Sequence, residues 1–146
     1  MDERKIQTYT LVSAPNVTGE NFIKLLNIYR KPFAALVNNP VEGQRMKKLG
    51  VRHLVEVDTV RHEAWEVPEL PIGDVYLFED SLPLCCRYLQ MVRSWTTGTI
   101  YVVKTNATPR LIYKALGADH VVHTNTRQVS FLLGAAPGQV PEEVLR

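Results

Sequence analysis

The segment SAPNVTG, residues 13–19, carries the clearest candidate chemistry in this 146-residue chain. It lies between a short apolar run and an amphipathic helix pattern, and backbone N–H groups at a helix N-terminus can bind a phosphate. Proteins that bind dinucleotides usually have a glycine-rich segment there, because glycine permits a tight turn and close approach of the ligand. Only Gly19 is present here. The segment is therefore a candidate nucleotide site with a degenerate glycine pattern.

A second candidate is the acidic pair Glu79-Asp80, which ends another apolar run. If that run is a strand of an open α/β sheet, its carboxyl end lies where ligands bind. The two carboxylates would then contact a ligand or act as one acid and one base. The alternative, which we favour, is that Asp80 or Ser81 caps the following helix. Lys104 and the residues after it are open to two similar interpretations, phosphate contact or helix cap.

The histidines and cysteines do not form a metal-ligand pattern. His120 and His123 are three residues apart on a predicted strand and therefore point to opposite faces. Cys85 and Cys86 are neighbours on a predicted helix, where successive side chains diverge by about 100°. Their apolar neighbours predict burial. We expect no metal site, no disulfide and no reactive cysteine.

Catalytic motifs are also missing from the sequence. No tyrosine is followed by a lysine four residues later, as a short-chain dehydrogenase requires, and no G-x-S-x-G, H-E-x-x-H or P-loop motif occurs. A receiver domain for phosphoryl transfer would use Asp58 and Lys104. Ser13-Ala14 stands where such a domain needs its acidic Mg²⁺ ligands. We predict no catalytic residues.

Apolar runs and amphipathic helix patterns alternate along the chain. Strands are predicted over residues 7–12, 32–37, 53–58, 74–80, 99–104 and 119–124. Helices are predicted near residues 22–29, 40–49, 81–95, 108–116 and 128–133. The segments LGVRHLV (49–55) and LGADHVV (116–122) repeat one pattern, a helix-ending glycine followed by a strand. This alternation predicts an α/β domain with a parallel sheet.

Composition limits the class of protein. The chain is 45% hydrophobic and 22% charged, which is typical of one globular domain. A net charge of +2 without a basic stripe argues against nucleic-acid binding. No signal peptide or membrane-spanning run is visible, and the only cysteines are adjacent. We therefore expect a cytoplasmic protein that does not insert into a membrane.

The order of these motifs resembles the TrkA N-terminal family, also called KTN or RCK nucleotide-binding domains. The resemblance covers about residues 6–133 and is most specific in the block VVKTNATPRLIYKALGADHVV, residues 102–122. It implies a single Rossmann-like domain with a doubly wound parallel sheet of strand order 3-2-1-4-5-6. Residues 1–133 would form this domain, and residues 134–146 a C-terminal tail or short docking segment.

The resemblance places Ala14, Asn16 and Gly19 at the three glycine positions of the fingerprint. Ala14 and Asn16 are expected to allow the turn, Asn16 by tolerating a left-handed backbone. Asn16 should also project its side chain where the pyrophosphate would lie, and Pro15 removes one donor. The N–H groups of residues 18–20 would remain for an anion, although the Glu20 carboxylate opposes one.

Two further positions follow from the resemblance. The acidic residue that usually ends the second strand and binds the ribose is replaced by Asn38-Asn39. Asp58-Thr59 matches the acidic position near the adenine. The predicted cofactor-binding residues are therefore Ala14, Pro15, Asn16, Val17, Thr18, Gly19, Asn38, Asn39, Asp58, Thr59 and Glu79.

The resemblance implies a non-catalytic regulatory domain that senses NAD(H) or an adenine nucleotide, without a metal. The alternative hypothesis is a Rossmann-fold interaction or scaffold module whose nucleotide pocket is vestigial. A small NAD-dependent enzyme is a third hypothesis. The resemblance also implies a homodimer and a protein partner such as a membrane transporter for potassium.

Overall fold

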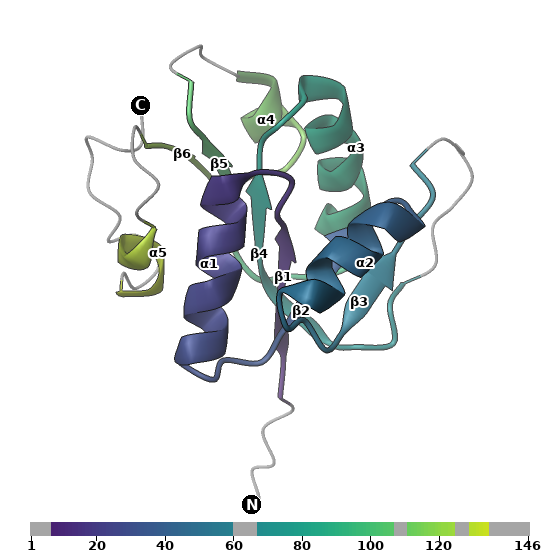
Figure 1. Cartoon of the computed structure of the whole chain (residues 1–146). Helices are drawn as coiled ribbons and strands as arrows, with labels where there is room; N and C mark the ends of the chain where they lie inside the picture. The colour runs from purple at the N-terminus through teal and green to yellow at the C-terminus, as the bar shows by residue number, and fades with distance from the viewer. Residues whose placement is uncertain (1–6, 60–66, 107–110, 125–128, 135–146) are drawn as a thin grey trace, which may run out of the picture.

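The computed structural model describes residues 7–59, 67–106, 111–124 and 129–134 (Figure 1). Over these residues the strands are β1 (Tyr9–Ser13), β2 (Phe33–Val37), β3 (Leu54–Glu56), β4 (Ile72–Phe78), β5 (Ile100–Lys104) and β6 (His120–His123). The helices are α1 (Val17–Ile28), α2 (Pro40–Lys48), α3 (Leu82–Arg93), α4 (Leu111–Ala115) and α5 (Ser130–Gly134). The predicted helix start at residues 108–109, His62 and most of the predicted tail lie outside the described residues.

The strands form one parallel sheet with the order β3-β2-β1-β4-β5-β6. This confirms the predicted Rossmann-like topology. β2 and β5 are buried along their whole length. Strands covered on both faces have no polar face, which explains why their sequences are continuous apolar runs rather than alternating ones.

Helices cover both faces of the sheet (Figure 1). On one face, α1, α2 and α5 pack through residues such as Phe22, Met46 and Leu132. On the other face, α3 and α4 pack through residues such as Leu89 and Tyr113. The two apolar layers are thus separated by the sheet, as expected for a doubly wound α/β domain. None of the helices in the described ranges is long and apolar enough to span a bilayer.

Several strand boundaries differ from the predicted ones, and those of β3 and β4 bear on the site. β3 covers only Leu54–Glu56, shorter than the predicted range 53–58, because it lies at the edge of the sheet and pairs only with β2. β4 begins at Ile72, two residues before the predicted start, because Tyr9 of β1 pairs with Ile72. β4 ends at Phe78, so Glu79 and Asp80 follow the strand rather than ending it.

The repeated helix-to-strand junction is confirmed. Gly50 has a φ of 91° and Gly117 a φ of 117°, both in the left-handed region. The residue after each glycine donates a hydrogen bond to the carbonyl five positions earlier, 3.1 Å at Val51 and 3.0 Å at Ala118. This is the Schellman arrangement, which satisfies carbonyls that the helix end leaves open.

Candidate functional site

The carboxyl ends of β1 and β4 lie side by side in the centre of the sheet. From this point the strand order runs outward in both directions, and ligands of open α/β sheets bind at such a topological switch point. A pocket of about 290 Å³ lies there. It is lined by residues 13–15 at the end of β1, residues 36–39 at the end of β2, Glu42 and Met46 of α2, Asp80, and Leu84 and Tyr88 of α3.

Asn16 caps the N-terminus of α1. Its Oδ1 accepts a hydrogen bond from the Gly19 N–H at 3.0 Å, and its Nδ2 donates to the Glu79 carbonyl at 3.0 Å. Its φ of −137° is extended rather than left-handed. The side chain therefore folds back onto the N-terminus of α1, where the prediction placed the pyrophosphate, and the turn needs no left-handed backbone at Asn16.

The same cap engages backbone N–H groups that were predicted to bind an anion at residues 18–20. The Gly19 N–H is bonded to Asn16, and the Glu20 N–H donates to the Asn16 carbonyl at 3.0 Å. Val17 and Thr18 complete the first turn of α1, whose N-terminal end carries a positive partial charge. A phosphate would reach the Gly19 N–H only by displacing the Asn16 cap.

Gly19 lies where α1 crosses closest to β1. A Cβ atom at this position would be 2.7 Å from the Ala14 Cα and 2.8 Å from the Ala14 Cβ. It would also lie 3.1 Å from the Phe78 ring. Gly19 is therefore required for packing, the role that the third glycine of a Rossmann fingerprint has.

Arg45 of α2 reaches across to the loop after β1. Its guanidinium donates to the Ala14 carbonyl, pairs with the Glu20 carboxylate, and pairs with the Glu42 carboxylate at 2.8 Å. The side chain is 29% exposed. The expected opposition between Glu20 and an anion is thus offset, because a cation already neutralises Glu20 beside the α1 N-terminus.

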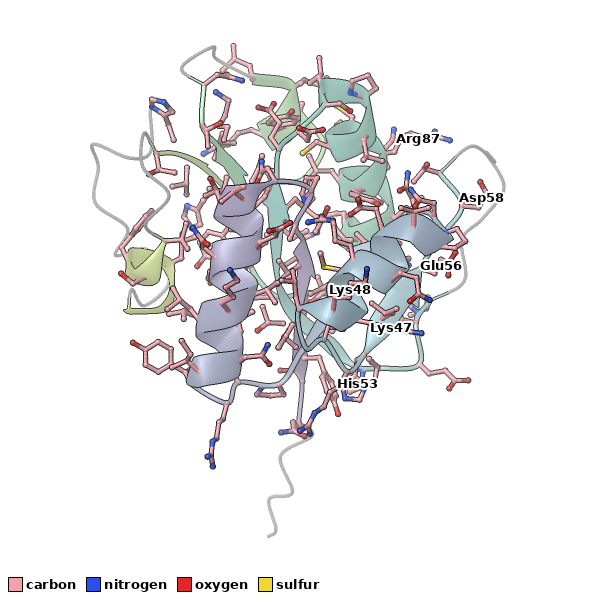
Figure 2. The ribbon with its side chains drawn as sticks, in the orientation of Figure 1. Lys47, Lys48, His53, Glu56, Asp58 and Arg87 are labelled. Atoms are coloured by element: carbon pink, nitrogen blue, oxygen red, sulfur yellow. The ribbon has the colours of Figure 1, made fainter. Side chains whose placement is uncertain are left out.

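The asparagines after β2 form a bonded chain with the segment after β3. Asn38 Nδ2 donates to Thr59 Oγ1 at 3.2 Å, and Asn39 Nδ2 donates to Asn38 Oδ1 at 3.1 Å. Arg87 of α3 donates two 3.1 Å bonds to the Thr59 carbonyl. Figure 2 shows Arg87 and the exposed Asp58 at this same end of the molecule. The edge of the pocket is therefore fixed from two helix layers.

Glu42 and Asp80 supply carboxylates to the pocket wall. Burial and the nearby Asp80 charge raise the pKa of Glu42 above its usual value, although Arg45 donates to the same carboxylate. Glu42 also lies in the first turn of α2, where its N–H donates to Asn39 Oδ1 at 2.8 Å. It lies beside the strand end where the acidic ribose ligand of the prediction is missing, and it can accept hydroxyl hydrogen bonds there.

Glu79 is buried and does not line the pocket. It is 6% exposed, and its carboxylate accepts hydrogen bonds from the Tyr113 hydroxyl and from Asn106 Nδ2 (3.3 Å). Lys104 is also buried and donates to the Asn106 carbonyl at 2.6 Å. Ser81, not Asp80, caps α3 by accepting from the Leu84 N–H, which confirms the favoured interpretation of this segment.

The cysteines differ in burial, and two of the histidines pack against aromatic rings. Cys85 is buried, and burial raises the pKa of its thiol to about 12, while Cys86 is partly exposed. His53 packs edge-on against Tyr9, and His120 stacks on Tyr101. Within the described ranges, no three His, Cys, Asp or Glu side chains are grouped so that they could hold a metal ion.

No protein-family model matches the sequence, and no curated protein matches it significantly. Solved structures do match its fold. The TrkA-N domain of the inner membrane protein YbaL from Escherichia coli aligns with a TM-score of 0.61 at 12% identity, over 90% of this chain and 98% of that one. The chain has a TrkA-N-like Rossmann fold. The GsuK channel bound to NAD aligns with a TM-score of 0.62 at 15% identity, over 79% of this chain and 21% of that one.

The TrkA-N-like fold brings part of the predicted site together. Residues 14–15 and 38–39 share the pocket wall, and residues 16–19 form the adjoining first turn of α1. Asp58, Thr59 and Glu79 are not among the described residues that line this pocket, although Thr59 is bonded to Asn38. Ligand contacts by these residues stay predictions.

Three site residues were missed from the sequence: Glu42, Arg45 and Arg87. Glu42 had a detectable signal, because an acidic residue three positions after a capping asparagine is a helix-start pattern beside a strand end. Arg45 and Arg87 had none. Their contacts with Ala14 and Thr59 depend on how α2 and α3 are oriented over the sheet.

Proposed function

We propose that this chain is a regulatory, non-catalytic domain that binds NAD(H) or an adenine nucleotide at the carboxyl edge of its sheet. The observation that carries the proposal is the pocket at the topological switch point, whose wall residues Ala14 and Pro15 lead into the α1 N-terminus and whose Ala14 carbonyl accepts from the Arg45 guanidinium. The NAD named for the GsuK structure supports this ligand class.

The pocket residues suit the parts of an adenine nucleotide. Phosphate oxygens would meet the first turn of α1 and Arg45, because both favour negative charge. Ribose hydroxyls would donate to Glu42 and bond to Asn38 or Asn39. Asp58 and Thr59 would lie toward the adenine. A volume of about 290 Å³ is at the small end of ligand pockets, which fits one nucleoside portion rather than a whole buried dinucleotide.

A regulatory role rather than catalysis is supported by the kind of groups present. The pocket wall carries amides and carboxylates, and Arg45, which is held by two carboxylates, donates to the carbonyl of the wall residue Ala14. The groups best suited to proton transfer form hydrogen bonds with other protein groups. They are Glu79, Lys104 and Tyr113. The domain would therefore respond to a ligand by changes of contact between α1, α2 and the loop after β1.

The partner proposal follows the names of the structural neighbours. One is a domain of an inner membrane protein and the other is a channel. We propose that this chain acts in the cytoplasm, pairs with a second copy of itself and signals ligand state to a membrane transport protein.

Arg45→Gln tests the placement of the phosphates. We expect Kd for ADP, measured by isothermal titration calorimetry, to rise roughly tenfold or more, because a charge-assisted bond to phosphate is lost. Lys47→Gln is the matched control, since Lys47 is exposed on the same helix outside the pocket wall and carries the same charge.

Three results are informative. Equal affinity in the two variants would show that the phosphates do not lie beside Arg45. A loss in Arg45→Gln for ADP but not for adenosine would support the arrangement proposed above. If the unaltered chain binds no adenine nucleotide, the scaffold hypothesis with a vestigial pocket replaces this one.

A further inference from the structure

A larger pocket lies at the opposite edge of the sheet from the nucleotide site. Its volume is about 670 Å³, within the range of small-molecule sites. It is formed by the start of β1, the end of α1 and the segments that lead into β2 and β3. The residues that matter most are Tyr9, Asn27, Arg30, Lys31, Arg52 and His53. Figure 2 shows His53 at the end of the molecule away from Asp58 and Arg87.

Three of the ten residues that line this amino-edge pocket are cationic. They are Arg30, Lys31 and Arg52, which come from two separate chain connections, and His53 follows Arg52. Across the described part of the chain, no carboxylate pairs with any of the three. A neighbouring hollow is lined by Arg52, His53 and Glu69. The wall of the amino-edge pocket itself contains no Asp or Glu.

Arg30 holds an unfavourable backbone conformation at this pocket. Its φ of 56° is left-handed, and it is the only non-glycine residue with a positive φ in the described ranges. It ends α1 in the same Schellman arrangement as the ends of α2 and α4, with the Lys31 N–H donating to the Leu26 carbonyl at 3.0 Å. The other two ends have glycine, Gly50 and Gly117, at the equivalent position. Strain of this kind is concentrated at functional sites.

Helix dipoles oppose an anion at this edge but are outweighed. The C-termini of α1 and α2 lie here, each with a partial charge of about −0.5. Arg30, Lys31 and Arg52 together contribute three full positive charges. The formal charge of the pocket lining is therefore positive.

We propose that the amino-edge pocket binds a small molecule with at least two phosphate groups, separately from the nucleotide site. Guanidinium groups recognise phosphate oxygens with paired N–H bonds, and two arginines with a lysine suit a di- or triphosphate group. Asn27 and the Tyr9–His53 ring pair supply further polar and aromatic wall for the rest of such a ligand. A favourable contact between Arg30 and a phosphate group would offset the free-energy cost of its left-handed backbone.

Inorganic pyrophosphate and tripolyphosphate are the probes, because they lack the base and ribose that the other site selects. Binding is measured by isothermal titration calorimetry at physiological salt with the full chain. The unaltered protein should bind both at sub-millimolar concentration. Arg52→Gln and Arg30→Gly should each weaken binding roughly tenfold. Lys114→Gln, an exposed lysine on α4, is the control of equal charge change and should leave affinity unaltered.

Arg30→Gly separates a ligand role from a structural one. Glycine relieves the left-handed strain, so the melting temperature of the variant should rise while its affinity for tripolyphosphate falls. A merely structural arginine would not show both changes.

Other outcomes would overturn the proposal. These are no binding, equal losses in Lys114→Gln and Arg52→Gln, or binding of single-stranded nucleic acid without binding of pyrophosphate. Loss of pyrophosphate binding in Arg45→Gln alone would place the anion at the carboxyl edge. The two proposals therefore fail independently.

Discussion

At the scale of single residues, Gly19 and Asn16 have two separate roles in the loop where a glycine-rich fingerprint usually lies. Gly19 permits α1 to lie against Ala14, whereas Asn16 satisfies the helix end with its own side chain. In a nucleotide-bound Rossmann domain the ligand phosphates meet that helix end. A self-capped loop is stable without ligand, so binding has to compete with the cap.

Gly19→Ala should destabilise the domain by about 1–3 kcal/mol, because the added methyl group meets backbone atoms of Ala14 that cannot move aside. Gly43→Ala is the matched control. Its Cβ would lie 3.4 Å from Leu54 Cδ1, an ordinary contact. That variant should be neutral or gain up to about 1 kcal/mol from helix propensity. Urea denaturation followed by circular dichroism measures both, and an unaltered midpoint for Gly19→Ala would contradict the packing role.

At the scale of elements, a buried polar cluster links α4 to the sheet. The fully buried Tyr113 hydroxyl donates to Glu79, and Glu79 also accepts from Asn106 after β5. The Glu79 carbonyl accepts from Asn16. The N-terminus of α1 is therefore connected through one residue to the opposite helix layer.

Tyr113→Phe should lower the free energy of unfolding by about 1–3 kcal/mol, since a buried carboxylate loses a donor. Tyr29→Phe provides the comparison, because Tyr29 is exposed and its hydroxyl has no comparable partner in the described residues. It should change stability by less than about 0.5 kcal/mol. Equal denaturation midpoints in the two variants would rule out a stabilising contribution from the Tyr113–Glu79 bond.

At the scale of the whole molecule, topology could be predicted because both faces of the sheet are buried. Continuous apolar runs such as residues 33–37 marked strands, and Gly50 and Gly117 marked helix ends. The site was less predictable. Three features of the two edges depend on tertiary packing, which local sequence does not encode. They are the bond from Asn16 to the Glu79 carbonyl, the bond from Arg45 to the Ala14 carbonyl and the left-handed backbone of Arg30.

The two edges of the sheet differ in electrostatic character. The carboxyl edge mixes amides, acids and Arg45, whereas the amino edge concentrates Arg30, Lys31 and Arg52. A ligand at each edge would contact opposite ends of α1 and α2, so the helices of one face connect the two sites.

The central claim is that the carboxyl-edge pocket binds an adenine nucleotide, and ligand-dependent stability tests it most directly. Melting of the full chain is followed with NAD⁺, NADH, ATP, ADP and AMP at millimolar concentration. A ligand present at about 100 times its Kd should add about 2.7 kcal/mol to the free energy of unfolding. The account predicts a clear rise in melting temperature with at least one of the five, reduced in Arg45→Gln. No shift with any of them would contradict it.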